Sequence, residues 1–131
     1  MNSKPILRVA NIHKRYQMGR NDYLNVLQGI DLSVNDGEII AIVGQSGVGK
    51  STLLHIIGIL DKADKGTVEI DGIDVSSFDE TKLANIRNKT AGFIFQAHHL
   101  LPEFTALENI MMPGLIGGLN RSQLKISALK L

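Results

Sequence analysis

Nine consecutive residues in the first half of the chain have the types and spacing needed to hold phosphate groups. Residues 44–51 read Gly-Gln-Ser-Gly-Val-Gly-Lys-Ser, which fits the phosphate-loop pattern G-x-x-x-x-G-K-[ST]. Because glycine has no side chain in the way, successive backbone N–H groups of such a loop can all point into one hollow. We therefore predict that a nucleoside triphosphate binds to Gly44, Gln45, Ser46, Gly47, Val48, Gly49, Lys50, Ser51 and Thr52.

Two side chains of this loop have separate predicted roles. The ammonium group of Lys50 can reach the β- and γ-phosphates, and the hydroxyl of Ser51 can ligate Mg²⁺. Mg²⁺ favours octahedral oxygen ligation and keeps waters and phosphate oxygens around it, so one hydroxyl from the protein is enough on this side.

The sequence around the loop predicts a strand, a loop and a helix in that order, which is the context that the pattern requires. Residues 38–43 read Glu-Ile-Ile-Ala-Ile-Val, an apolar run that favours a buried strand. After the loop, apolar residues recur at helical spacing over 50–57, and Gly58 is a typical stop.

The rest of the chain alternates apolar stretches with polar turns. We expect strands at 6–12, 26–34, 66–70 and 91–95, a polar loop over 16–25, and helices at 78–88, 105–116 (interrupted at Pro113) and 122–131. The early strands favour an antiparallel front layer, whereas the later alternation of strands and helices favours a parallel sheet. The predicted fold class is therefore α/β.

Composition excludes several classes of function. The net charge of +1 gives no strong field for nucleic acid, so no nucleic-acid partner is expected. The absence of cysteine excludes a disulfide framework and a thiolate metal site. No apolar stretch approaches the roughly 18 residues of a membrane span, and the first residues lack the apolar core of a signal peptide. Adjacent His98 and His99 do not share a helix face as paired metal ligands do.

Four segments in order resemble the nucleotide-binding subunits of ATP-binding cassette (ABC) transporters. They are an aromatic residue at Tyr16, the phosphate loop, Gly66-Thr-Val-Glu-Ile-Asp-Gly72, and Gly92-Phe-Ile-Phe-Gln96. The stretch from His98 to Asn109 is most similar to the group of lipoprotein-releasing and macrolide-exporting ATPases. The resemblance covers essentially the whole chain and implies the fold of a phosphate-loop NTPase.

The resemblance also implies roles for residues outside the loop. Tyr16 would stack on adenine, and Gln96 would contact Mg²⁺ and the attacking water. The cofactors would be ATP and Mg²⁺. The partners would be integral membrane transporter subunits and a second copy of the ATPase subunit. The location would be the cytoplasm, peripheral on the inner face of the cell membrane, and residues 100–108 would face the membrane partner.

Three further motifs of the family do not occur in this chain: the Leu-Ser-Gly-Gly-Gln signature, the second acidic motif and the switch histidine. The nearest substitute, Leu115-Ile-Gly-Gly-Leu119, lacks both the serine and the glutamine and reads as a loop. We therefore expect residues 1–131 to be the N-terminal portion of one ABC ATPase domain, truncated before the catalytic base, so that it binds nucleotide but turns over poorly.

Two other interpretations stay open at this stage. One is a different phosphate-loop enzyme, such as a small-molecule kinase or a GTPase; Asn88-Lys89-Thr90-Ala91 begins like a guanine-reading motif but lacks its aspartate. The other is a nucleotide-binding interaction fragment that does not hydrolyse. Fold analogy alone does not separate these classes.

Overall fold

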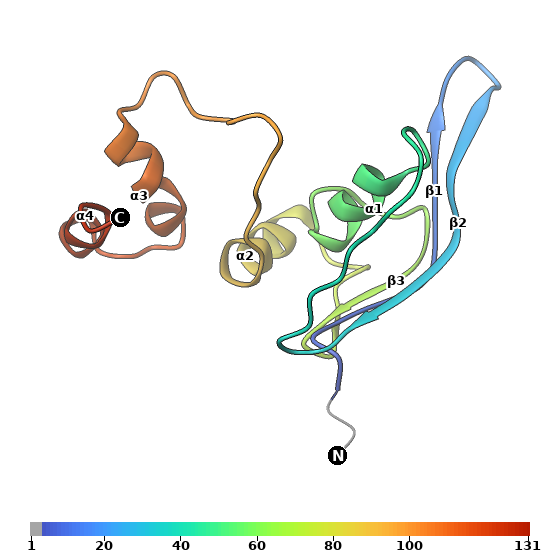
Figure 1. The fold of residues 1–131 in the computed structure, drawn as a ribbon, viewed down its shortest axis with the longest axis horizontal. Helices are drawn as coiled ribbons and strands as arrows, with labels where there is room; N and C mark the ends of the chain where they lie inside the picture. Colours follow the sequence, from blue (N-terminus) through green and yellow to red (C-terminus); the bar gives the residue numbers. More distant parts are fainter. Residues whose placement is uncertain (1–3) are drawn as a thin grey trace. The chain divides into compact units, whose positions relative to one another are not determined.

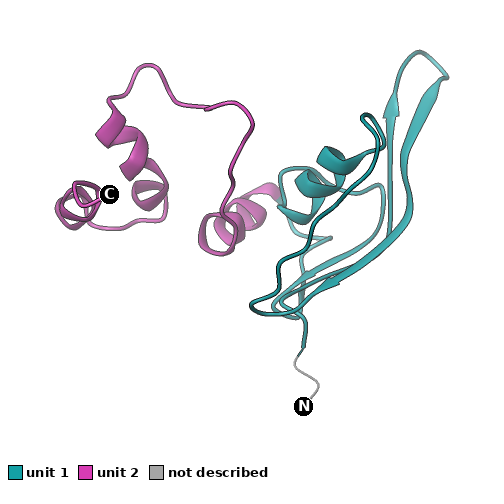
Figure 2. Ribbon diagram, viewed as in Figure 1, with its two compact units in different colours: residues 1–79 teal, residues 80–131 magenta. Residues whose placement is uncertain are grey.

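The structure, a computed structural model, describes residues 4–131 and divides into two compact units (Figure 2). The first unit ends at Asp79 and contains the sheet and the phosphate loop. The second unit begins at Glu80 and contains three helices and a long loop.

A four-stranded antiparallel sheet forms the framework of the first unit (Figure 1). Its strands are β1 (Leu7–Gln17), β2 (Tyr23–Val34), β3 (Lys65–Ile70) and β4 (Ile73–Asp74), in the spatial order β2-β1-β3-β4. Each neighbouring pair is antiparallel. The predicted antiparallel front layer is therefore confirmed.

The hairpin between β1 and β2 is longer than the sequence indicated. We predicted a polar turn or long hairpin loop over 16–25, but the turn is confined to residues 18–22, because Tyr16 pairs with Leu24 and Gln17 pairs with Tyr23. The end of the hairpin lies beyond the core, so its side chains are exposed on both faces and show no alternation of buried and exposed positions. As a result, Tyr16 lies within a paired strand and not in a loop.

A bulge in β1 lets two residues three positions apart both point into the core. In a regular strand, residues at this spacing point to opposite faces of the sheet. Val9 and Ile12 are both buried, and the register shifts between them. Asn11 takes the extra position with φ 52°, and its N–H donates to Asp31 Oδ1 at 2.9 Å. Opposite the bulge, a Cβ on Gly66 would lie 2.5 Å from the carbonyl oxygen of Asn11, so only glycine fits there.

Helix α1 (Lys50–Ile57) follows the phosphate loop and contributes to the core of the first unit. Leu53 and Ile56 are buried, and Gly58 ends the helix by donating its N–H to the Leu54 carbonyl at 3.0 Å. Both helix bounds were predicted correctly. The other buried apolar residues of this unit are Val9, Ile12, Leu27, Ile59, Val68 and Val75.

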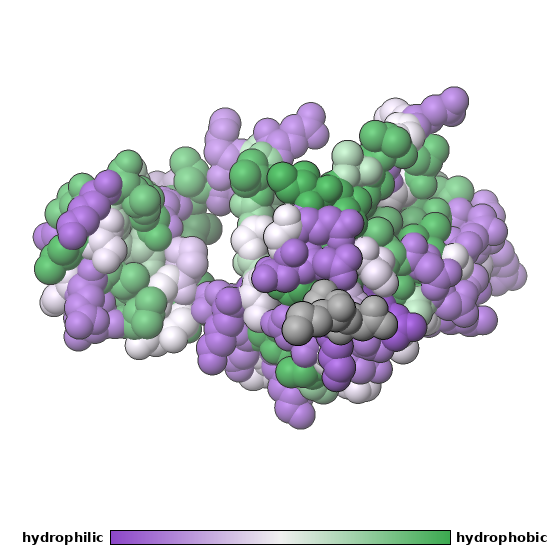
Figure 3. Space-filling model, turned by 60° about the horizontal axis from the view of Figure 1, so that its bottom comes forward, coloured by the Kyte–Doolittle hydropathy of each residue, from purple (hydrophilic) through white to green (hydrophobic). Residues whose placement is uncertain are grey.

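Two strands that the sequence predicted do not form. Residues 38–43 and 91–95 have no strand assignment, and the predicted parallel sheet is absent from the part of the chain that the structure describes. Most of their apolar side chains stay exposed: Ile39 to 97%, Val43 to 86% and Ile94 fully. A strand needs a neighbouring strand for its backbone hydrogen bonds, and these runs have none within residues 4–131. Figure 3 shows apolar residues, in green, at the surface among the polar ones.

The second unit contains α2 (Glu80–Thr90), α3 (Ala106–Ile116) and α4 (Arg121–Ala128). The expected interruption at Pro113 is wrong, since α3 continues through it. Proline removes one helical hydrogen bond. A capping box between Thr105 and Glu108 and the burial of Met111 offset that loss.

No helix within residues 4–131 is long and apolar enough to cross a membrane.

Candidate functional site

Local backbone geometry shapes the phosphate loop. Gly49 is the N-cap of α1 with φ 100°, and no side chain caps the free N–H groups of the first turn. A Cβ at this position would lie 2.8 Å from Val26 Cγ1 and 3.1 Å from the Val26 carbonyl oxygen. The loop therefore fits closely against β2 only because residue 49 is glycine. The uncapped helix start leaves N–H donors and the positive end of the helix dipole available to an anion.

The side chain of Lys50 folds back across the loop. Its ammonium donates to the carbonyl oxygens of Gly44 at 2.9 Å and of Gln45 at 2.6 Å. These contacts hold the positive charge over the loop, next to the helix start. Gly44 lies close to the Val48 side chain, because a Cβ on Gly44 would lie 3.1 Å from Val48 Cγ2.

The predicted loop residues surround one hollow of about 270 Å³. It is open to solvent and is lined by Val26, Ser46, Gly47, Gly49, Lys50, Ser51 and Thr52. Six of the nine predicted residues thus line the hollow, and Gly44 and Gln45 supply the carbonyls that hold Lys50. The arrangement concentrates backbone donors, one cation and three hydroxyls in a small volume, which suits a phosphorylated ligand with a divalent cation.

Tyr16 is anchored by residues that the sequence did not reveal. Its hydroxyl donates to Asp61 Oδ2 at 3.2 Å, and Lys14 Nζ donates to Asp61 Oδ1 at 2.8 Å. Lys14 Nζ also lies 5.3 Å from the centroid of the Tyr16 ring. Asp61 lies in the polar turn between α1 and β3. Its partners on β1 are more than 40 positions away, so no local signal could identify them.

Burial is the largest single effect on the pKa of Asp61 and raises it, but several lowering effects together outweigh it. Hydrogen bonds from the Lys14 side chain, the Lys62 backbone and the Tyr16 hydroxyl, together with the charge of Lys14, hold the pKa below the ordinary value of 3.8. The group is therefore ionised at neutral pH, and its two oxygens act as acceptors.

Gln96 belongs to the second unit, in the loop between α2 and α3, and is exposed. Close to it in sequence, the rings of Phe93 and Phe95 stack at 5.5 Å and His99 meets Phe95 edge-on at 4.7 Å. Because Gln96 and the phosphate loop lie in different units, its predicted contact with Mg²⁺ stays a prediction. Within residues 4–131, no three His, Cys, Asp or Glu residues cluster to form a metal site.

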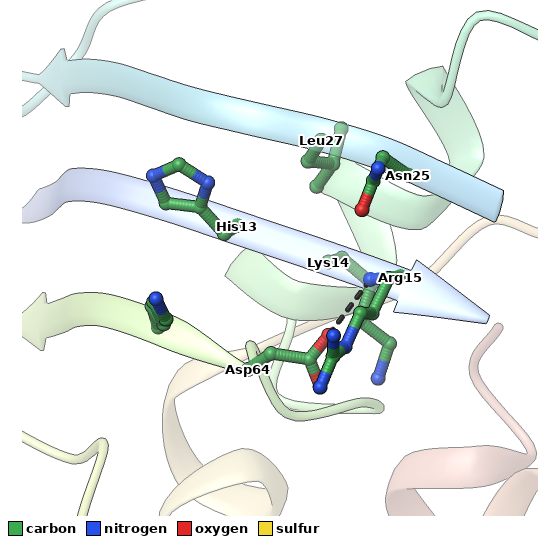
Figure 4. Close-up of a pocket in the computed structure, with 7 residues that line it drawn as sticks. His13, Lys14, Arg15, Asn25, Leu27 and Asp64 are labelled. Atoms are coloured by element: carbon green, nitrogen blue, oxygen red, sulfur yellow. Dashed lines mark hydrogen bonds between the residues drawn. The ribbon is translucent and has the colours of Figure 1, made fainter. Parts of the chain in front are cut away.

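A second hollow, of about 250 Å³, lies on the sheet (Figure 4). It is lined by His13, Lys14, Arg15, Asn25, Leu27, Asp64 and Lys65. Asp64 Oδ2 accepts the backbone N–H of Arg15 at 2.7 Å, the dashed line in Figure 4. Asp64 thus joins the turn before β3 to β1, one position away from Tyr16.

Comparison with known proteins identifies the family. The sequence profile of the family described as "ABC transporter" matches residues 27–130. The chain belongs to the ABC transporter family. The match begins within β2 and includes the whole phosphate loop, α1 and the second unit through its last helix, α4.

Among ABC transporter proteins, the chain is similar to curated lipoprotein-releasing system ATP-binding proteins LolD. It is 51% identical to that of Alcanivorax borkumensis over 89% of this chain and 51% of the relative. It is 48% identical to that of Porphyromonas gingivalis over 96% of this chain and 55% of the relative. The chain thus spans about half the length of the curated relatives it matches.

A solved structure from the ABC transporter family has the same fold. The dimeric post-hydrolysis state of the ATP-binding cassette MJ0796, bound to ADP and Pi, matches with a TM-score of 0.87 at 37% identity. The match covers 95% of this chain and 54% of that one. The predicted fold class and family resemblance are therefore confirmed, whereas the roles of individual site residues stay predictions.

Proposed function

We propose that this chain is the nucleotide-binding portion of an ABC transporter ATPase subunit that serves lipoprotein release or related export. The observation that carries the proposal is the phosphate loop, in which Lys50, Ser51 and the uncapped start of α1 surround one hollow. The triphosphate of ATP bound there would accept hydrogen bonds from backbone N–H groups and from the Lys50 ammonium in place of water. Its base would lie toward Tyr16.

Mg²⁺ completes this proposed site. The Ser51 hydroxyl lines the hollow at the first turn of α1 and would supply one oxygen ligand, with phosphate oxygens and water supplying others. Gln96 is the proposed second protein contact. When bound, the ion would neutralise charge on the phosphates.

The proposed partners are integral membrane subunits and a second copy of the ATPase subunit, at the inner face of the cell membrane. The segment proposed to meet the membrane subunits contains Leu100, Leu101 and Phe104, which are 64%, 42% and 43% exposed. Asn109 on α3 fixes this segment: its side chain bonds to the backbone of Leu101 and to the Phe104 carbonyl, at 2.8–3.1 Å. An apolar cluster on a rigid loop suits a docking surface, because little ordering is required on binding.

We also propose that residues 1–131 correspond to part of one nucleotide-binding domain. Most of the apolar residues in the two runs that the sequence assigns to strands stay exposed here, so further strands could pair with them; they are Ile39, Ile40, Val43, Ile94 and Phe95. No residue of this chain is assigned as the catalytic base. We therefore expect the chain to bind ATP more readily than it hydrolyses it.

The dependence of ATP affinity on Mg²⁺ tests the proposal. We expect Mg²⁺ to tighten ATP binding by the wild-type chain, and Ser51→Ala to remove most of that gain. Ser122→Ala, an exposed serine at the start of α4, is the matched control and should keep it. ATP binding that is equally Mg²⁺-dependent in Ser51→Ala would reject this assignment of the metal ligand.

A further inference from the structure

The turn after α1 carries a carboxylate whose position is fixed by the helix. The backbone N–H groups of Leu60 and Asp61 donate to the His55 carbonyl at 2.7 and 3.2 Å. Asp61 therefore stays attached to the last turn of the helix whose first turn begins at Lys50. A displacement of the helix would displace the carboxylate with it.

Both oxygens of that carboxylate are used. Oδ1 accepts from Lys14 Nζ at 2.8 Å and from the Lys62 backbone N–H at 2.7 Å, and Oδ2 accepts from the Tyr16 hydroxyl at 3.2 Å. Lys14 Nζ makes a further bond to the Lys62 carbonyl at 2.7 Å, and its side chain is only 11% exposed. The cluster is thus a connected network between β1 and the end of α1.

The network restricts Tyr16 in three ways. Its backbone pairs with Leu24 on β2, its hydroxyl bonds to Asp61, and the Lys14 ammonium lies over its ring at 5.3 Å. The residue still keeps 38% of its surface exposed. The ring therefore has a fixed orientation while part of it stays accessible to a ligand.

We propose that Asp61, with Lys14, is a positioning residue for nucleotide binding: it locks the Tyr16 ring for stacking on the base and ties that ring to the helix that holds the phosphates. This inference rests on the proposed function. Because the ring is already fixed in the free protein, binding loses less side-chain entropy. This tightens binding by about two- to tenfold in affinity. A base of any kind would benefit, because every base has a π-face.

A purely structural role for Asp61 makes a different prediction. If the network only joined β1 to the turn after α1, its loss would loosen the whole first unit and weaken every ligand of the phosphate loop alike. A positioning role affects only ligands that carry a base. Inorganic tripolyphosphate, which has the phosphates without the base, distinguishes the structural role from the positioning role.

The chain contains a matched control for this comparison. Asp64 lies three residues after Asp61 and also bonds to β1, through the backbone N–H of Arg15 at 2.7 Å (Figure 4). It makes a similar link between the same two segments without a described contact to Tyr16. Asp64→Ala therefore reports the effect of loosening β1 alone.

The experiment measures affinities for Mg-ATP and for magnesium tripolyphosphate in the wild type, Asp61→Ala, Tyr16→Phe and Asp64→Ala. We expect Asp61→Ala and Tyr16→Phe each to weaken ATP about two- to tenfold and to leave tripolyphosphate unchanged. We expect Asp64→Ala to change neither. Tyr16→Phe removes a single hydroxyl, so the test remains decisive even if Asp61→Ala does not fold.

A second step uses Tyr16→Ala as the background. Once the ring is gone, adding Asp61→Ala should cause no further loss of ATP affinity. The proposal is overturned if Asp61→Ala weakens tripolyphosphate as much as ATP, or if it still weakens ATP without the ring. Lys50→Ala should weaken both ligands; if it weakens neither, the proposed phosphate site fails, a result distinct from failure of the Asp61 proposal.

Discussion

Replacing Gly49 by alanine should destabilise the chain more than the same substitution at a glycine with open space around it. Residue 49 has φ 100°, a left-handed conformation that costs an L-residue about 1–2 kcal/mol. The added Cβ would also lie 2.8 Å from Val26 Cγ1 and 3.1 Å from the Val26 carbonyl oxygen. Overpacking of this kind costs about 1–3 kcal/mol more. The expected loss in the free energy of unfolding is therefore about 2–5 kcal/mol.

Gly37 provides the control. It has φ 73°, also left-handed, but nothing lies within 4 Å of an added Cβ. Gly37→Ala should therefore cost only the conformational part, about 1–2 kcal/mol. The two variants separate backbone strain from the collision with β2.

Urea unfolding of the chain, followed by circular dichroism, measures both variants. With a denaturant slope of about 1–3 kcal/mol/M, Gly49→Ala should unfold at a urea concentration lower than Gly37→Ala by about 1 M. Gly49→Ala should also weaken ATP, because the start of α1 must move away from Val26. Equal midpoints for the two variants would refute the claim that close packing on β2 shapes the loop.

Two further predictions concern the network and the proposed docking segment. Because the folded pKa of Asp61 lies below its ordinary value of 3.8, its contribution to stability should be complete above that pH and lost as pH falls through the folded pKa. The stability difference between wild type and Asp61→Asn, measured by urea unfolding, should therefore shrink below about pH 4; a difference that stays constant down to pH 2 would contradict it. Phe104→Asp should weaken association with vesicles carrying the cognate membrane subunits about tenfold or more, as for a buried aromatic anchor. Ile116→Asp, an exposed apolar control on α3, should have little effect, and an equal loss in both variants would argue against a specific docking segment.

Local features of the site could be predicted from the sequence. The phosphate loop and both ends of α1 depend on glycine positions and apolar spacing within about fifteen residues, and the structure has them where they were predicted. Gly49 illustrates why: the local pattern places a glycine at the N-cap of α1, although its close contact with Val26 of β2 depends on the fold.

Features that depend on distant partners could not be predicted in the same way. The run at 38–43 has strand composition, but a strand forms only beside another strand, and composition does not show whether one is present. Pairing with β2 extended β1 through Tyr16, although the local residues resemble a turn. Asp61 acquired its role through contacts with β1 that only the folded chain provides.

The most direct test of the account is the affinity of the chain for Mg-ATP with and without the Lys50 ammonium. Lys50 lies over the loop, held by the Gly44 and Gln45 carbonyls, where it can transfer its contacts to a phosphate. Loss of a charge-assisted contact costs about 1.5–3 kcal/mol, so titration with a fluorescent ATP analogue should show Lys50→Ala binding roughly ten- to a hundredfold more weakly. Equal affinity in wild type and Lys50→Ala would contradict the assignment of this loop as the nucleotide site.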